Sequence, residues 1–396
     1  MITQRLCLFS AGLLLAATAV AENITPRLKL NGFATAGAAF LEEDSGGYQY
    51  MQNSYGRAGI SERLNTKFDS VIGLQLDYQV NDSTNLVTQL VGRGQNQSSA
   101  NGASAQNTFQ VNADWAYIRY AFNDAWFARA GRLGFPGFML SDSMLIGHAH
   151  PWVRPPAEVY ANTPVPSLQG FDVNYRHDFG SWTLGSQLFA GSSDTSDSRL
   201  ALHNTTSLYF TLENDDLTLR AGGMSFKLDN SVSLTPLPNL DTRKYSHFVS
   251  AGFSYDNEVW LLNGEWVQQS VEDWPVDFNA GYVTVGHYFG KWLPYTYWAT
   301  IDTMGEDRKT KGAINTRPAS IFEQSTVALG LRFDPKPGLS LKVQVEHIHD
   351  IGSYDGIFRY SSAGAPFPGV GGLAGGATLP QIEDTNLYSF TANVAF

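Results

Sequence analysis

Apolar and polar residues alternate one by one along many short stretches of this chain. In the clearest stretch, residues 68–80, one parity carries Phe68, Ile72, Leu74, Leu76, Tyr78 and Val80, and the other carries Asp69, Gln75, Asp77 and Gln79. Successive side chains of a β-strand point to opposite faces, so this pattern predicts a strand with one face in an apolar medium and the other in water. The last twelve residues, Thr385 to Phe396, follow the same pattern and end on an aromatic residue.

The alternation predicts sixteen strands in all. They cover residues 28–40, 68–80, 84–93, 111–122, 126–132, 171–177, 182–191, 206–212, 217–228, 247–255, 259–267, 280–289, 293–301, 325–333, 339–348 and 385–396. The apolar residues are spread over these strands and do not gather into long core runs. An all-β fold is therefore expected.

The connections between these segments alternate in length. The short ones are rich in Asn, Asp, Gly and Pro, and cover residues 81–83, 123–124, 178–180, 214–216, 256–257, 289–291 and 334–338. The long ones cover residues 42–67, 94–110, 133–169, 192–205, 229–246, 268–279, 302–324 and 349–384. This regular alternation predicts an antiparallel up-and-down β-barrel that crosses a membrane, with tight turns at one end and long loops at the other. A soluble all-β sandwich, the alternative, has Greek-key links that would not alternate so regularly.

The first residues read as a secretory signal peptide. Arg5 precedes an apolar run, Leu6 to Ala17, and the small-x-small step Ala19-Val20-Ala21. The run falls short of the ~20 apolar residues that a transmembrane helix needs, which argues against a membrane anchor. We expect cleavage of residues 1–21 and a single barrel domain over residues 22–396. Cys7 is the only cysteine and would leave with the signal, so the mature chain would have no thiol.

Charge and composition narrow the class of protein. Without Arg5 the chain has 25 basic and 37 acidic residues, a net charge of −12, which argues against a nucleic-acid partner. No later run reaches the length of a membrane helix, whereas a closed barrel satisfies every backbone group in lipid. Aromatic residues flank the short turns, for example Tyr120, Trp126 and Trp292. Such positions are typical of the interfacial girdles of membrane barrels.

Together these features resemble the trimeric general porins of Gram-negative outer membranes. The resemblance covers the whole chain after the signal segment. It implies an outer-membrane homotrimer in contact with lipid and lipopolysaccharide, with a water-filled channel for small hydrophilic solutes. Small residues on the outward face of the first strand, Ala34, Ala36 and Ala38, would let subunits approach closely.

In that family the loop after the fifth strand folds back into the barrel and narrows the channel. Here the corresponding segment is residues 133–169, which contains six prolines and several large apolar side chains, including Phe135, Phe138 and Trp152. A disordered surface loop is rarely so apolar. A sixteen-stranded barrel encloses a lumen too wide for its own side chains to fill, so an ordered, stiff segment would set the bore.

The family sets wall arginines against carboxylates of that loop. Carried over to this chain, the basic side would be Arg93, Arg119 and Arg132, the acidic side Asp142 and Glu158, with Arg154 as an added loop cation. Arg154 or Glu158 could equally pin the loop to the wall through an ion pair. Arg129 and Arg132 fall on opposite faces of the strand at 126–132, which leaves its phase open. Charges at a constriction should outweigh distant loop charges, because salt screens beyond ~8 Å; we therefore expect a preference for small organic anions.

Motifs for catalysis or metal binding are weak. There is no Gly-x-Ser-x-Gly, and the pairs His148/His150 and His347/His349 have no fitting carboxylates or cysteines beside them. The glycine-rich segment 369–376 is not followed by a predicted helix, as a nucleotide loop would be. We expect no catalytic residue, cofactor or metal. Two alternatives stay open, a substrate-specific channel with a saturable site and a barrel enzyme.

Overall fold

The computed structural model describes residues 22–42, 48–50, 60–97, 106–161, 165–193, 201–229, 243–272, 277–304, 313–314, 317–318, 323–351, 358–360 and 384–396. Its main strands are β2 Leu28–Leu41, β4 Val71–Asn81, β5 Thr84–Gln97, β6 Gln106–Ala121, β7 Trp126–Gly134, β8 Ser167–Phe179, β9 Trp182–Ser193, β10 Ala201–Glu213, β11 Leu217–Asp229, β12 Arg243–Asp256, β13 Trp260–Val271, β14 Phe278–His287, β15 Trp292–Thr303, β18 Glu323–Lys336, β19 Leu339–His349 and β21 Thr385–Ala395. Short elements are β1 Glu22–Thr25, β3 Tyr48–Tyr50, β16 Ala313–Ile314, β17 Arg317–Pro318, β20 Phe358–Tyr360, the 3-10 turn η1 Gly147–Ala149 and the helix α1 Ala157–Tyr160.

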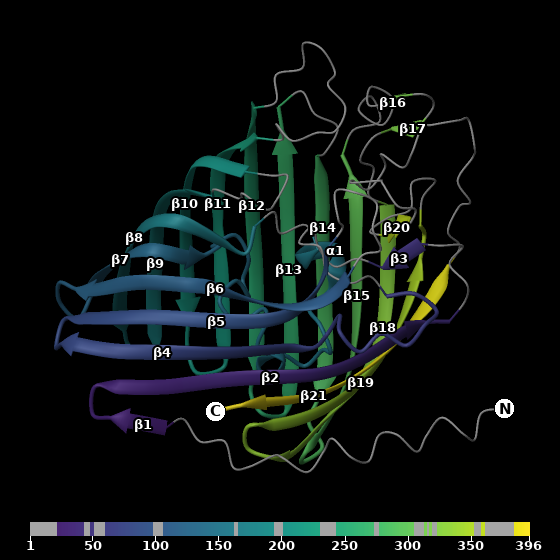
Figure 1. Ribbon diagram of the computed structural model, residues 1–396, viewed down its shortest axis with the longest axis horizontal. Coiled ribbons are helices and arrows are strands. Elements are labelled where there is room, and N and C mark those ends of the chain that lie inside the picture. Colours follow the sequence, from purple (N-terminus) through teal and green to yellow (C-terminus); the bar gives the residue numbers. More distant parts are fainter. Residues whose placement is uncertain are drawn as a thin grey trace.

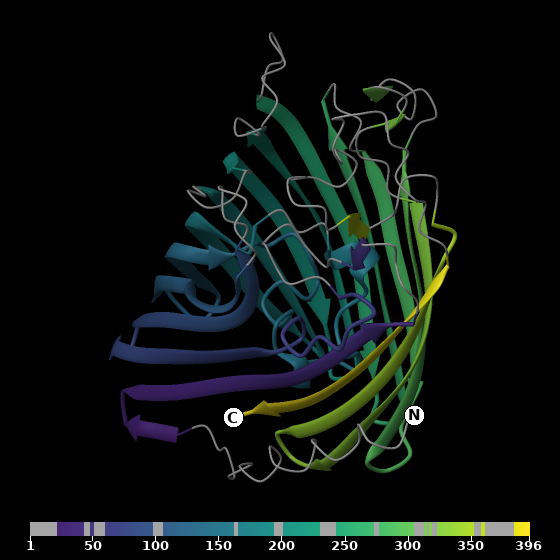
Figure 2. The same cartoon turned by 45° about the vertical axis from the view of Figure 1, so that its right-hand side comes forward.

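The sixteen main strands form a closed ring. Each pairs antiparallel with the next along the chain, and the ring closes where β2 pairs with β21, for example Ala36 opposite Ala392. Figure 1 shows β2 in purple beside β21 in yellow, and the ring of strands can be followed further in Figure 2. The predicted sixteen-stranded antiparallel barrel is confirmed.

The chain end closes the barrel below β21. The Phe396 amide donates to the Gly32 carbonyl at 2.9 Å, and the Gly32 amide donates to the Phe396 carbonyl at 2.8 Å. Beyond this point β1 pairs with Leu28 to Leu30 and so covers the part of β2 that β21 does not reach. An open strand edge in lipid would leave backbone groups without hydrogen-bond partners. The pairing of β2 with Phe396 and with β1 removes such an edge.

The outer face of the barrel carries the apolar parity of the strands. On β4 the side chains of Ile72, Leu74, Leu76, Tyr78 and Val80 are all exposed, which confirms the predicted face. Phe68, which the same pattern placed on that face, is buried and precedes β4. A broad exposed apolar belt on a closed barrel is the surface that hydrocarbon covers. Among the described residues, no helix is both long and apolar enough to cross a bilayer.

Short turns gather at one end of the barrel, the turn end, and long connections at the other, the loop end. Three of the turns begin with an asparagine whose Oδ1 accepts two backbone amides: Asn123, Asn214 and Asn257. Such side chains stabilise a reversal of the chain. Most of the predicted loop 94–110 is strand, because β5 and β6 continue to Gln97 and from Gln106. The predicted signal segment 1–21 and the glycine-rich segment 369–376 lie outside the described residues.

Candidate functional site

The described part of the connection between β7 and β8, residues 135–161 and 165–166, lies inside the barrel, and we call it the inner loop. Its first part is fastened to the wall by backbone groups. The Arg220 guanidinium donates to the Pro136 carbonyl at 2.6 Å, Ser250 Oγ donates to the Gly137 carbonyl at 2.8 Å, and the Met139 amide donates to Glu265 Oε1 at 2.7 Å. The wall residues come from β11, β12 and β13, so three neighbouring strands hold this part.

Aromatic packing holds the loop against the same side of the barrel. The buried rings of Phe135, Phe138, Trp152 and Tyr160 join wall side chains in one apolar cluster. Trp152 packs edge-on against Tyr282 at 5.4 Å between centroids, and its Nε1 donates to Thr284 Oγ1 at 3.0 Å. Burial of a large apolar side chain stabilises the folded state by about 1.5–3 kcal/mol. The aromatic residues of the loop therefore attach it to the wall.

Arg154 lies at the centre of a buried ionic cluster beneath the loop. Its guanidinium binds both oxygens of Asp69, at 2.9 and 2.8 Å, pairs with Glu346, and donates to Ser389 Oγ at 2.5 Å. The Arg154 side chain is 3 % exposed. Arg154 thus pins the loop to the wall through ion pairs with Asp69 and Glu346. Glu346 also accepts from the Tyr297 hydroxyl at 2.7 Å.

Glu158 lies in α1, the short helix of the inner loop, and is also buried, with 1 % of its surface exposed. Its Oε1 accepts hydrogen bonds from Gln324 Nε2 at 2.7 Å and from Thr326 Oγ1. Burial raises the pKa of this carboxyl group, and the two hydrogen bonds oppose that change. Glu158 thus connects the loop to β18.

The middle of the loop is held by cations of the wall. Lys342 Nζ donates to the carbonyls of Gly147, His150 and Trp152, the last two at 2.6 and 2.7 Å. Arg332 donates to the His150 carbonyl at 2.9 Å. The buried His150 ring donates from Nε2 to the Ser143 carbonyl at 2.7 Å, and burial lowers its pKa to about 4. The imidazole is therefore neutral near pH 7.

The wall away from these anchors carries two arginines, Arg129 and Arg119, that are only partly buried. Arg129 of β7 binds Asp172 of β8, with its Nε 3.1 Å from both carboxylate oxygens, and Gln187 adds a hydrogen bond to Asp172 at 2.8 Å. Arg119, paired in register with Arg129, lies over the Phe127 ring at 4.2 Å. Its neighbours Ile118 and Tyr120 are exposed on the outer face, so Arg119 points into the lumen.

Asp142 is the exposed carboxylate of the inner loop. A Cβ added at Gly134 would lie 3.3 Å from Asp142 Oδ1 and 3.1 Å from Trp115 Nε1, which places Asp142 beside β6 and β7. Its charge acts on Arg129 and on Arg220. Of the six sequence-derived residues, Arg119 and Asp142 are thus the two that reach the open lumen.

The remaining two arginines lie elsewhere. Arg93 points inward but is buried against Asp114 at 3.3 Å, with 7 % of its side chain exposed. Arg132 is paired in register with Ala116 and Gln169, on the parity of the outward-facing strand positions. The register therefore separates Arg132 from Arg119. Asp172 enters the site without a distinct sequence signal, since inward polar residues occur on many of the strands.

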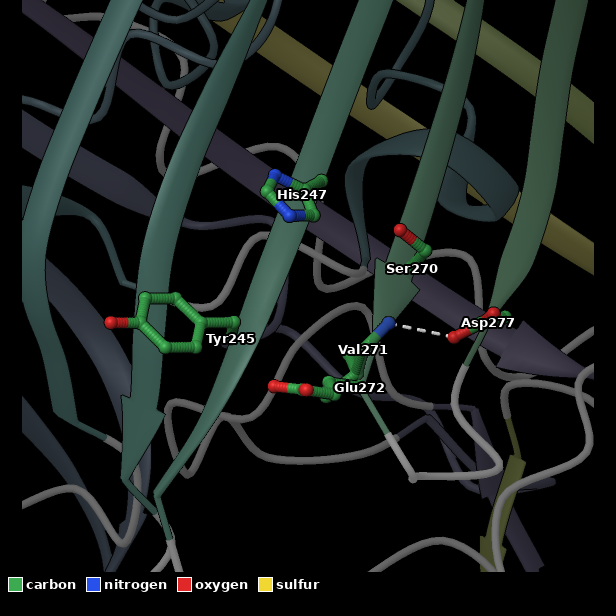
Figure 3. Close-up of a pocket in the computed structure, with 6 residues that line it drawn as sticks. All are labelled: Tyr245, His247, Ser270, Val271, Glu272 and Asp277. Atoms are coloured by element: carbon green, nitrogen blue, oxygen red, sulfur yellow. Dashed lines mark hydrogen bonds between the residues drawn. The ribbon is translucent and has the colours of Figure 1, made fainter.

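A cavity of about 410 Å³ lies outside the lumen, at the loop end of β12 and β13 (Figure 3). It is lined by Tyr245, His247, Ser270, Val271, Glu272 and Asp277. Tyr245 is exposed on the outer face of the barrel, and His247 points to the same face. Asp277 Oδ1 accepts a hydrogen bond from the Val271 amide at 2.7 Å. Within the described part of the chain, no three His, Cys, Asp or Glu side chains gather into a possible metal site.

Comparison with known proteins gives fold-level similarity. No family model and no curated protein sequence matches the chain. OmpF of Salmonella typhi, in complex with daunomycin, superimposes with a TM-score of 0.57 at 13% identity, over 93% of this chain and 97% of that one. The anion-selective porin of Comamonas acidovorans gives 0.55 at 14% identity, over 93% and 99%.

The trimer form of OmpT, an outer membrane protein of Vibrio cholerae, gives a TM-score of 0.53 at 12% identity, over 93% of this chain and 99% of that one. These matches span almost the full length of both partners. The chain therefore has the fold of the general porins of Gram-negative outer membranes.

Proposed function

We propose that this protein is an outer-membrane porin, a water-filled channel for passive diffusion of small hydrophilic solutes and ions. One observation carries the proposal: an ordered loop is fastened along one inner side of a closed sixteen-stranded barrel, while charged side chains on the opposite wall stay in contact with water. A barrel of this strand number is too wide to be filled by its own side chains. The loop narrows the lumen without closing it.

The constriction in this proposal lies beside β6 and β7, where Asp142 of the inner loop and the wall cations Arg119 and Arg129 face the open lumen. Opposite charges around a narrow aqueous gap create a local field that favours dipolar solutes. Arg154 and Glu158 act as anchors of the loop, because both side chains are buried against the barrel wall. Arg93, buried against Asp114, supports the wall in the same way.

Ion preference depends on the balance of charges at this gap. Arg129 is neutralised in part by Asp172, whereas Arg119 forms no ion pair with a carboxylate of the described residues. Arg119 and the exposed carboxylate Asp142 then remain as one cation and one anion at the constriction. We place the path of permeating ions closer to Arg119, which favours small organic anions. The acidic net charge of the whole chain acts from farther away and is screened by salt.

The proposed assembly is a homotrimer embedded in lipid and lipopolysaccharide. Ala34, Ala36 and Ala38 lie on the outer parity of β2, and Ala36 faces Ala392 of β21 across the ladder. Small side chains there permit close approach of a second copy. Chemical crosslinking in detergent should yield a three-subunit species, and monomers alone at every protein concentration would contradict the trimer.

Single-channel recording in planar bilayers tests the channel itself. Purified protein should give long-lived current steps that rise linearly with voltage. In a salt gradient the reversal potential of the wild type should indicate an anion preference, and Arg119→Gln should move it towards cations. Bilayers that stay closed at every voltage would contradict the proposal, and an unchanged reversal potential would remove Arg119 from the constriction.

A further inference from the structure

A second group of charges lies at the turn end of the lumen, away from Asp142 and Arg119. It surrounds a cavity of about 530 Å³, which we call the turn-end pocket, lined by His148, Lys291, Arg332, Asp334, Pro335, Lys336 and Pro337. Three of these side chains are cations and one is an acid. The pocket therefore carries an excess of positive charge in a chain whose net charge is −11.

Arg332 and Lys291 of the pocket are each held in place by protein partners. Arg332 Nε lies 3.0 and 2.9 Å from the two oxygens of Asp334, and Arg332 Nη1 donates to the His150 carbonyl. Lys291 Nζ donates to the Pro335 carbonyl at 2.6 Å. Pro335 and Pro337 stiffen the turn that carries Lys336. An ordered set of charges binds a ligand with less loss of conformational entropy than a mobile one.

The Arg332–Asp334 pair is neutral overall, so the other charged residues that line the pocket are the two lysines, Lys291 and Lys336. Both side chains are exposed and project from neighbouring short turns, the β14–β15 turn and the end of β18. The ammonium group of lysine is a compact point charge that binds phosphate and carboxylate groups without demanding one geometry. His148 reaches the pocket from the inner loop, so the pocket lies between loop and wall at the mouth of the lumen.

We propose that the turn-end pocket binds small dianionic solutes, such as inorganic phosphate, at the mouth of the channel opposite the long loops. Within the proposed channel, this pocket would be a binding site for one class of solute. This binding rests on the proposed function only for the passage of the solute. Binding in the pocket can be measured on its own.

The experiment uses the full-length protein in detergent, titrated with inorganic phosphate at low ionic strength and mildly alkaline pH, and followed by calorimetry. The test variant is Lys291→Gln/Lys336→Gln. The control variant, Arg176→Gln/Lys227→Gln, removes the exposed Arg176 and the half-buried Lys227, and it has the same net charge as the test variant. Arg332 is left intact, because it also holds the inner loop.

We expect saturable binding by the wild type, unchanged binding by the control, and binding about tenfold or more weaker in the test variant, because two attractive charges are lost. Equal binding by all three proteins, or no saturable binding by the wild type, would overturn the inference. Planar-bilayer recording of the same samples separates the two claims. Channels that conduct while phosphate does not bind overturn the pocket alone, and binding without conduction overturns the channel alone.

Discussion

Replacement of Arg154 by leucine should release the inner loop from the wall. The substitution keeps an apolar stem but leaves Asp69 and Glu346, 4 % and 1 % exposed, without their cation. Removing one partner of a buried ion pair costs about 3–5 kcal/mol. Here two carboxylates are stranded, so the upper part of that range applies. The ladder hydrogen bonds of the barrel do not involve this side chain, so the cost falls on docking of the loop.

Hydrogen exchange of the loop amides measures this cost. The Val153 amide donates to Gln344 Oε1 at 3.1 Å only while the loop is docked. Since about 1.4 kcal/mol is a factor of ten, a loss of about 4 kcal/mol speeds exchange in the peptide around Val153 by roughly a thousandfold. Amides of β13 should exchange as in the wild type.

Arg176→Leu is the matched control. Arg176 also faces two carboxylates, Asp178 at 3.5 Å and Glu213 at 3.7 Å, but its side chain is 58% exposed. Exposed pairs contribute at most about 1 kcal/mol, so loop exchange should stay unchanged. Adding Asp69→Asn and Glu346→Gln to the Arg154 variant should restore part of the protection. Wild-type exchange rates in Arg154→Leu would refute the anchoring role, and failure of the triple variant to recover would refute stranded charge as its cause.

Two further predictions concern pH and chain closure. His150 has a pKa of about 4 in the docked loop against 6.5 when free, so docking of the loop should weaken by up to about 3 kcal/mol as pH falls from 6.5 to 4. Glu158 acts in the opposite sense, because burial raises its pKa. His150→Asn should remove the histidine part of the pH dependence of hydrogen exchange in the loop. Gly32→Ala would place its Cβ 2.4 Å from the Phe396 ring, so it should destabilise the barrel by about 1–3 kcal/mol and lower the temperature at which the folded band disappears in gel electrophoresis. Gly185→Ala, whose Cβ would lie 3.7 Å from Thr211, should leave that temperature unchanged. Equal temperatures for the two variants would exclude the Phe396 contact as the cause.

The alternation of apolar and polar residues predicted the barrel well, because hydrocarbon on one face and water on the other constrain every second position of a spanning strand. The same reason explains where the boundaries failed. Above the apolar belt both faces are wet, so the pattern stops while the ladder continues. β10 therefore begins at Ala201, five residues before the predicted start, and β5 extends to Gln97.

The site was harder to predict. Proline and aromatic content predicted an ordered loop inside the lumen, and Arg154 and Glu158 stood out as ionisable residues within it. Their partners could not be found in the same way, because Glu346 is 192 residues away and alternation says only that it points inward. Which inward side chains lie at one height depends on the stagger of the strands around the barrel, which no single strand encodes.

The most direct test of the central claim labels the lumen at one residue. Asp142→Cys, combined with Cys7→Ser, places a single thiol on the inner loop, and a bulky water-soluble thiol reagent is added during single-channel recording. We expect a lasting drop in the conductance of Asp142→Cys, with no drop for Lys227→Cys on the outer face in the same background. Complete labelling of Asp142→Cys with an unchanged current would contradict a channel narrowed by the inner loop.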